Sequence, residues 1–197
     1  MAKSFFSESG FSLAEVAVAT GILATVSLGV AQMFALSTSK NLAARQQVST
    51  TTLATQKMEQ LRGLTFSYDS GGLGLPVTDT STNLSKCTSD QTGTGLNPSP
   101  NGVLDPINNS GVDTTGYVDY LDGQGTCLGT GSTPPAGAIF TRRWSIVALP
   151  MNPNNTLVLT VLVTPTAKDA IRAPSPDGRT RFPEDAMLIT VRTRKAP

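Results

Sequence analysis

An apolar run near the N-terminus constrains this chain more than any other feature of its sequence. Residues 11–36 are 26 consecutive positions at which Glu15 carries the only charge. With a rise of about 1.5 Å per residue, such a helix would be roughly 39 Å long, more than the hydrocarbon core of a bilayer at about 30 Å. A chain of 197 residues offers no core large enough to surround this helix. We therefore expect residues 11–36 to span a membrane.

Small residues recur at every fourth position of the run, and on a helix they would form one face. Small side chains let the backbone of one membrane helix approach another closely, so we interpret this face as a helix-packing surface. The alternative is that glycine and alanine are simply common in membrane helices. The four positions of the predicted packing face are Ala17, Gly21, Thr25 and Gly29.

Glu15 is the unusual residue of the run. An ionised side chain within an apolar span costs a few kcal/mol and usually has a partner. Because Glu15 lies near the N-terminal end, its carboxylate could also reach the water interface. The residues alone leave two interpretations open: an interfacial acid that marks the start of the helix, or a counter-ion for a positive charge on another chain.

The junction ahead of the run combines a polar leader, a glycine, an aromatic residue and an acid. The leader MAKSFFSESG ends at Gly10, and residues 10–25 read GFSLAEVAVATGILAT. This junction resembles the type IV pilin-like family, which includes minor pilins and the pseudopilins of type II secretion. The resemblance implies that a prepilin peptidase cuts between Gly10 and Phe11 and that the Phe11 nitrogen is methylated. It also implies that Glu15 meets the N-terminal amine of a neighbouring subunit.

Two other N-terminal signals also contain an apolar run. A secretory signal has an apolar core of about 7–15 residues that ends in an A-x-A-like cleavage site. Here the core is longer, and residues 35–37 (ALS) make a poor cleavage site. A plain signal anchor is the second alternative. The leader departs from the family pattern in one respect, because Lys3 is offset by Glu8.

Charge and glycine content divide the chain into three unlike parts. The net charge is +2 over residues 1–62, −6 over 63–137 and +5 over 138–197, so the total of +1 conceals a strong asymmetry. The middle part also holds 14 of the 18 glycines, which predicts loops with short strands. The predicted segments are a leader at 1–10, a transmembrane half-helix at 11–36, an amphipathic half-helix at 37–62, a Gly/Asp-rich loop region at 63–137 and an antiparallel β-sheet at 138–197.

The second half of the predicted helix carries only a thin apolar stripe. Ala54, Met58 and Leu61, together with Thr50 or Thr51, follow helical spacing. Gly63 is typical of a helix end. Because this stripe is thin, we expect the outer half of the helix to pack on the remaining domain.

Strand patterns fill the last third of the chain. They cover residues 138–149, 156–164 and 186–193, and the alternation in the second run predicts a strand with two covered faces. We therefore expect an α+β fold in which the long N-terminal helix packs on a C-terminal antiparallel β-sheet and buries these runs. The resemblance implies the same arrangement, the pilin-like lollipop. In the third run, Met187, Ile189 and Val191 lie on one side.

Two motifs of the middle part suggest further chemistry. Asp113, Asp119 and Asp122 stand close together in a Gly-containing stretch, and carboxylate oxygens suit Ca²⁺. The alternative is that Asp-Gly pairs simply make turns. Cys87 and Cys127 flank most of this stretch, and outside the cytoplasm such a pair commonly closes a disulfide. Two free thiols, or pairing between chains, are the alternatives.

Arg142, Arg143 and Trp144 invite a nucleic-acid interpretation, because cations lie beside an aromatic ring. The stronger interpretation is that one arginine faces water, the other pairs locally and the tryptophan fills the core. The basic residues near the C-terminus favour nucleic acid only slightly, since some members of the resembled family take part in DNA uptake. These residues are Arg179, Arg181, Arg192, Arg194 and Lys195.

The composition favours a building block over a catalyst. The chain has no histidine, so the commonest general base and metal ligand is absent, and the head contains no G-x-S-x-G or S-x-x-K motif. From the resemblance we expect a minor pilin, a structural subunit of a type IV pilus-like fibre that is not an enzyme and uses no cofactor or metal. The alternatives are a pseudopilin of type II secretion, a membrane-anchored adhesin or DNA-binding module and, less favoured, an anchored periplasmic enzyme.

The resemblance also implies partners and a location. The expected partners are other pilin-like subunits, prepilin peptidase, an inner-membrane assembly platform and the lipid bilayer, whereas nucleic acid is disfavoured. The chain would first be a single-pass protein of the bacterial inner membrane with its head in the periplasm. It would then enter a pilus or pseudopilus.

Overall fold

The structure is a computed structural model that describes most of the chain. It describes residues 10–69, 71, 73–85, 87, 93–101, 103–104, 113–169, 171 and 181–194. Leader residues 1–9, with Lys3 and Glu8, lie outside the described residues, as do Arg179 and Lys195. The chain divides into two compact units, Met1–Leu42 and Ala43–Pro197, and the second unit is called the head below.

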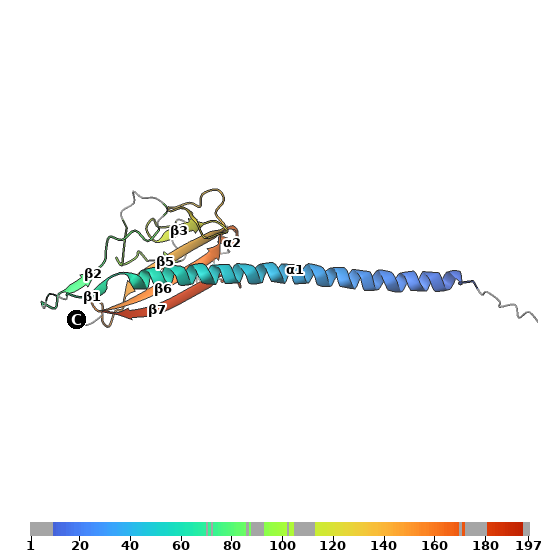
Figure 1. The fold of residues 1–197 in the computed structure, drawn as a ribbon, viewed down its shortest axis with the longest axis horizontal. Coiled ribbons are helices and arrows are strands. Elements are labelled where there is room, and N and C mark those ends of the chain that lie inside the picture. Colours follow the sequence, from blue (N-terminus) through green and yellow to red (C-terminus); the bar gives the residue numbers. More distant parts are fainter. Residues whose placement is uncertain are drawn as a thin grey trace, which may run out of the picture. The chain divides into compact units, whose positions relative to one another are not determined.

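The long helix predicted from the sequence is present. Helix α1 runs over Leu13–Gly63, so it begins two residues after Phe11 and ends at the predicted glycine (Figure 1). Of the described helices, α1 alone is long and apolar enough to cross a membrane. The second helix, α2, is a short segment at Thr166–Asp169.

The head is built on an antiparallel sheet of five strands in the order β4-β3-β5-β6-β7. Its three longest strands coincide with the predicted runs to within two residues, which confirms the α+β fold. A separate two-stranded hairpin, β1-β2, follows the end of α1 (Figure 1). The strands are β1 Phe66–Tyr68, β2 Pro76–Thr78, β3 Val118–Leu121, β4 Cys127–Gly129, β5 Phe140–Ala148, β6 Thr156–Pro165 and β7 Ala186–Thr193.

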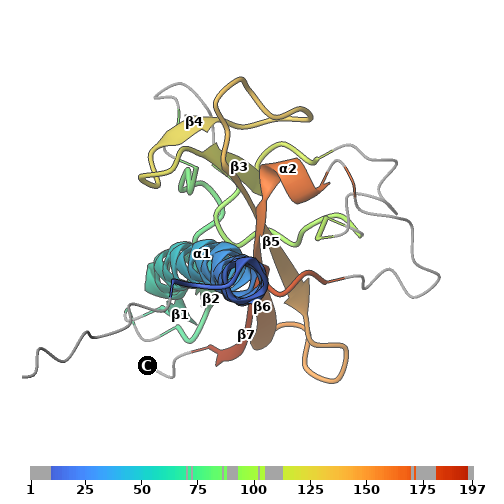
Figure 2. The same ribbon diagram turned by 90° about the vertical axis from the view of Figure 1, so that its right-hand side faces the viewer.

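The second half of α1 lies across one face of this sheet (Figure 2). Its stripe of Ala54, Met58 and Leu61 is buried as predicted and packs with sheet residues such as Trp144 and Val161. At roughly 25 cal/mol per Å² of apolar surface, burying each large side chain contributes about 1.5–3 kcal/mol. The full set of buried α1 residues is Thr50, Leu53, Ala54, Lys57, Met58 and Leu61.

The inner strand β6 and the edge strand β7 differ in how their faces are covered. Strand β6 is buried on both faces, which confirms the prediction from its alternation. Strand β7 is an edge strand, and the expectation that its apolar side is buried is wrong: Met187, Ile189 and Val191 are 41%, 61% and 60% exposed. The reason is that α1 covers the opposite face, on which Leu188 packs against the core.

Candidate functional site

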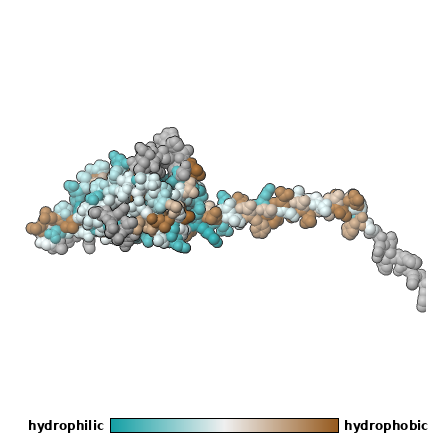
Figure 3. All heavy atoms as spheres, turned by 90° about the horizontal axis from the view of Figure 1, so that it is seen from above, coloured by the Kyte–Doolittle hydropathy of each residue, from teal (hydrophilic) through white to brown (hydrophobic). Residues whose placement is uncertain are grey.

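The first half of α1 exposes its side chains along its whole length. Residues 11–42 are all exposed, and Phe11 and Leu13 reach 89% and 88%. Figure 3 shows apolar side chains following this segment on the face in view. An exposed apolar surface of this size on a helix marks a contact with lipid or with another protein chain.

Glu15 closes the N-terminal end of α1. The backbone N–H of Ser12 donates to Oε2 of Glu15 at 3.0 Å, and the Ser12 hydroxyl accepts from the Ala14 N–H at 3.2 Å. This reciprocal S-x-x-E arrangement is a capping box, which satisfies N–H groups that have no partner within the helix. The acid therefore caps the start of the helix. Among the described residues its second carboxylate oxygen, Oε1, accepts no hydrogen bond.

The predicted packing face of Ala17, Gly21, Thr25 and Gly29 is exposed in the chain. A Cβ atom added at Gly21 or Gly29 would meet no described atom within 4 Å, so no contact within the described chain requires glycine there. The Thr25 hydroxyl donates to the Gly21 carbonyl at 2.8 Å. This polar group is thus satisfied inside the helix, as an apolar environment demands.

A buried lysine joins α1 to the sheet. The Lys57 ammonium lies 2.9 Å from Oδ2 of Asp119 on β3 and donates to the Leu84 carbonyl at 2.7 Å. It also stands 3.9 Å from the centre of the Trp144 ring, a cation–π distance. Both charged side chains are fully buried. The thin apolar stripe did not predict that Lys57 is buried, because long charged side chains normally reach water.

Arg142 completes this network on the helix-facing side of β5. Its guanidinium donates from Nε and Nη2 to the two oxygens of Asp119, each at 2.8 Å, which is a bidentate pair. Nη1 donates to the Leu53 carbonyl of α1 at 3.2 Å. Asp119 thus serves two cations at once, one from the helix and one from the sheet.

Arg143 forms a second buried network on the opposite face of the sheet. Its Nε and Nη2 donate to Asp113 at 2.5 and 3.0 Å, and its Nη1 lies 2.9 Å from Asp169. The Tyr120 hydroxyl donates to Asp113 at 2.7 Å. Burial and this hydrogen bond to a carboxylate raise the pKa of Tyr120 well above 10. Tyr120 therefore remains a neutral donor at every physiological pH.

These two networks correct the prediction for the arginine pair. Neither arginine faces water: Arg142 is 4% and Arg143 2% exposed, and Trp144 is completely buried. Neighbouring residues of a strand point to opposite faces, and here both faces are covered. None of the three side chains therefore lies on a surface that could contact nucleic acid.

The three aspartates considered as Ca²⁺ ligands do not converge, and Asp122 makes the turn that was the alternative interpretation. Asp113 and Asp119 are held by arginines on opposite faces of the sheet. Asp122 instead accepts the N–H groups of Gln124 and Thr126, both at 2.8 Å, in the β3-β4 turn. In the described part of the chain, no three acidic, cysteine or histidine side chains are placed to hold a metal ion.

Of the basic residues near the C-terminus that the structure describes, Arg192 and Arg194 bind backbone carbonyls, and Arg181 donates to the sulfur of Met187. Arg192 donates to the carbonyls of Leu61 and Leu64 at the end of α1, and burial followed by the charge of Arg62 lowers its pKa. Arg194 donates to carbonyls of the β1-β2 hairpin, including that of Val77 at 2.7 Å. Cations at a helix C-terminus are favourable because they oppose the helix dipole.

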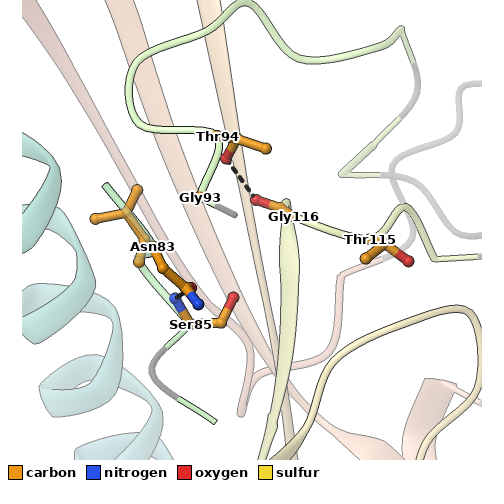
Figure 4. A pocket seen from close by; sticks show the side chains of 7 residues that line it. Asn83, Ser85, Gly93, Thr94, Thr115 and Gly116 are labelled. Carbon is orange, nitrogen blue, oxygen red and sulfur yellow. Dashed lines mark hydrogen bonds between the residues drawn. The ribbon is translucent and has the colours of Figure 1, made fainter. Parts of the chain in front are cut away.

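Cys87 and Cys127 form the predicted disulfide within the chain. A pocket of about 240 Å³ lies beside residues 83–85, shortly before Cys87 (Figure 4). The Thr94 hydroxyl spans it and donates to the Gly116 carbonyl at 2.9 Å. The described lining residues offer one side-chain amide and three hydroxyls but no acid or cation, so they include no pair of nucleophile and base. The lining residues are Asn83, Leu84, Ser85, Gly93, Thr94, Thr115 and Gly116.

Comparison with known proteins identifies no relative, since no family model, curated protein or solved structure matches this chain.

Proposed function

We propose that this chain is a structural subunit, a minor pilin, of a type IV pilus-like fibre. The observation that carries the proposal is the junction of Gly10, Phe11 and Glu15 at the start of an exposed apolar helix. Prepilin peptidase would cut after Gly10, and the first half of α1 would hold the subunit in the inner membrane until it joins the fibre. The chain would act by assembly and would not be an enzyme.

Glu15 would set the register between neighbouring subunits. Cleavage creates a positively charged amine at Phe11, which can be methylated without losing its charge. The capping bond from Ser12 uses one carboxylate oxygen of Glu15, so Oε1 is available for the amine of a neighbouring chain. An ion pair of this kind in an apolar environment specifies register more than it adds net stability.

The packing face would allow helices to approach one another in the fibre. Gly21 and Gly29 meet nothing in the described chain where a side chain would stand, and small residues at this spacing permit close backbone contact. The disulfide supports export of the head, because such bonds persist outside the reducing cytoplasm.

A pseudopilin of type II secretion is the alternative within the same class. Both proteins would share the junction, the membrane helix and the head, so the neighbouring genes distinguish them: a pilus-assembly cluster supports the first and a secretion cluster the second. A DNA-binding head is disfavoured by the burial of Arg142, Arg143 and Trp144.

N-terminal sequencing and mass measurement of the membrane form test the proposal. We expect a chain that starts at methylated Phe11, and a Gly10→Val variant that keeps its leader because the cleavage site is blocked. A mature start beyond residue 36 would show a secretory signal instead. An unprocessed wild-type chain would show a plain signal anchor.

A further inference from the structure

Three partners of Lys57 surround its ammonium in the head, and together they are here called the Lys57 socket. Its walls are the Asp119 carboxylate, the Leu84 carbonyl and the ring of Trp144. A buried ammonium is stable only while its N–H groups have acceptors, since removing one leaves a charged donor without compensation. The socket therefore contributes to holding this part of α1 against the sheet.

The disulfide joins two of these walls. Leu84 lies three residues before Cys87, and its side chain is itself buried in the core. Asp119 lies on β3, and the neighbouring strand β4 begins at Cys127, which pairs with Leu121 two residues after Asp119. The Cys87–Cys127 bond thus ties the segment that carries the Leu84 carbonyl to the hairpin that carries the carboxylate.

We propose that the Cys87–Cys127 disulfide closes the Lys57 socket and thereby couples oxidation of the two cysteines to docking of the second half of α1 on the sheet. In the reduced chain the segment at Leu84 loses this covalent link, and the Leu84 carbonyl moves away from the Lys57 ammonium. The ammonium then returns to water, and this part of α1 leaves the core with it. This inference stands without the fibre function, because every group in it belongs to the head.

The covalent step is a thiol–disulfide exchange with a disulfide donor. The thiols of Cys87 and Cys127 give up two electrons and two protons and form one S–S bond. The donor's S–S bond breaks, and the donor takes up those electrons and protons to become two thiols. In the experiment the donor is oxidised glutathione, which leaves as two molecules of glutathione.

Hydrogen exchange on the full chain in detergent tests the coupling. The oxidised protein is compared with protein reduced by dithiothreitol, and amide exchange is followed along α1. We expect reduction to speed exchange of residues 53–61 by at least about tenfold, since the helix opens locally. Exchange of residues 16–36 should not change, because that part of α1 does not contact the socket.

Two matched variants separate this coupling from a general loosening of the head. Lys57→Met keeps the length of the side chain and removes the ammonium, so reduction should speed exchange of residues 53–61 much less than in the native chain. Arg192→Met removes another cation that binds α1, at Leu61, but leaves the socket intact, and its response to reduction should match the native one. An equal response in all three proteins, or none in the native chain, would overturn the proposal.

Trp144 supplies a readout that needs no variant. It is the only tryptophan of the chain, and the Lys57 ammonium stands over its ring. We expect reduction to move the emission maximum of the native protein to longer wavelength as water enters the socket, and reoxidation by glutathione disulfide to reverse the shift. An emission maximum that does not move on reduction would contradict opening of the socket.

Discussion

The two halves of helix α1 share one backbone but are built for different surroundings. Residues 13–42 are exposed on every side and carry a single acid within the apolar run, at Glu15. Residues 43–63 bury one stripe against the sheet, including the charged side chain of Lys57. A helix shows a uniform apolar surface only where its partner is lipid or another helix, and a one-sided stripe where its partner is its own domain.

The difference shows which contacts fix the position of each half. The second half is fixed by partners within the chain, because Asp119, Leu84 and Trp144 hold Lys57 at one register. The first half has no such partner among the described residues, and its distinctive groups, Glu15 and the small-residue face, point to a partner that another chain must provide. Three predictions below test this division, first by fibre assembly and then by the stability of the head, and a fourth concerns a turn of the head. The effects on stability run from the largest expected to the smallest.

Replacing the acid of each half should give opposite outcomes. Glu15→Val should insert in the membrane and fold normally, but its incorporation into fibres should fall at least roughly tenfold, the factor for about 1.4 kcal/mol of lost interaction. Glu59→Val is the control, since Glu59 makes only an exposed pair with Arg62 on the second half. Immunoblotting of sheared fibres and membranes measures both; equal incorporation of the two variants would argue against a register role for Glu15.

Removing the shared counter-ion of the head should destabilise it severely. Asp119→Asn leaves the cations of Lys57 and Arg142 buried beside a neutral amide, and breaking a buried ion pair in this way costs about 3–5 kcal/mol. Urea unfolding followed by Trp144 emission measures the change. Asp122→Asn, in an exposed turn, is the control and should change the free energy of unfolding far less. A loss below about 1 kcal/mol for Asp119→Asn would show that the network does not hold α1.

Leucine truncations compare the two halves directly. Leu61→Ala opens a cavity in the core and should lower the free energy of unfolding of the head by about 2–5 kcal/mol. Leu28→Ala removes an exposed side chain of the first half and should change it by less than roughly 0.5 kcal/mol. If Leu28→Ala lowers the free energy of unfolding of the head as much as Leu61→Ala does, the first half of α1 also stabilises the head, and the division between the two halves is wrong.

Lowering the pH should slightly reduce the free energy of unfolding of the head, because it protonates Asp79. Hydrogen bonds from the Thr82 hydroxyl, then from the backbone of Thr82 and Ser81, hold the pKa of Asp79 below its usual 3.8. Because the folded pKa is depressed, this stabilisation is complete above about pH 4 and is lost as the pH falls through the folded pKa. Asp79 lies in a partly exposed turn where solvent screens its charge, so the effect should stay under about 1 kcal/mol.

Asp79→Asn provides the comparison for this acid effect. The amide oxygen can still accept the turn N–H groups but does not titrate. The difference in urea midpoint between pH 6 and pH 2.5 should therefore be smaller in the variant than in the native chain. An identical pH dependence in both proteins would assign the acid sensitivity to other carboxylates.

The course of the backbone could largely be predicted from local pattern. Gly63 marked the end of α1, and alternation marked β5, β6 and β7, because helix ends and strands are set by neighbours in sequence. The partners of charged groups could not be predicted in this way. Arg142 and Arg143 bind carboxylates 23 and 30 residues away, and which face each occupies depends on how β3 pairs with β5.

The same reasoning explains the error at the sheet edge and why the aspartate stretch is not a metal site. Met187, Ile189 and Val191 have the alternation of a buried face, but burial requires a covering element, and the helix lies on the other side. Asp113, Asp119 and Asp122 are close in sequence, yet a strand and a turn separate them in space. Of the candidate site, the disulfide was predictable because the two cysteines had few alternatives, whereas Lys57 gave no local signal.

The arginine at the end of β7 has a consequence for the order in which the chain can fold. Arg192 donates to the Leu61 carbonyl across 131 residues of sequence, so the end of the first helix is capped by the last strand. Contacts between residues so far apart in the sequence form late and slow the folding of a domain. During synthesis, therefore, α1 must wait until almost the whole head has been translated before its C-terminal carbonyls gain this partner.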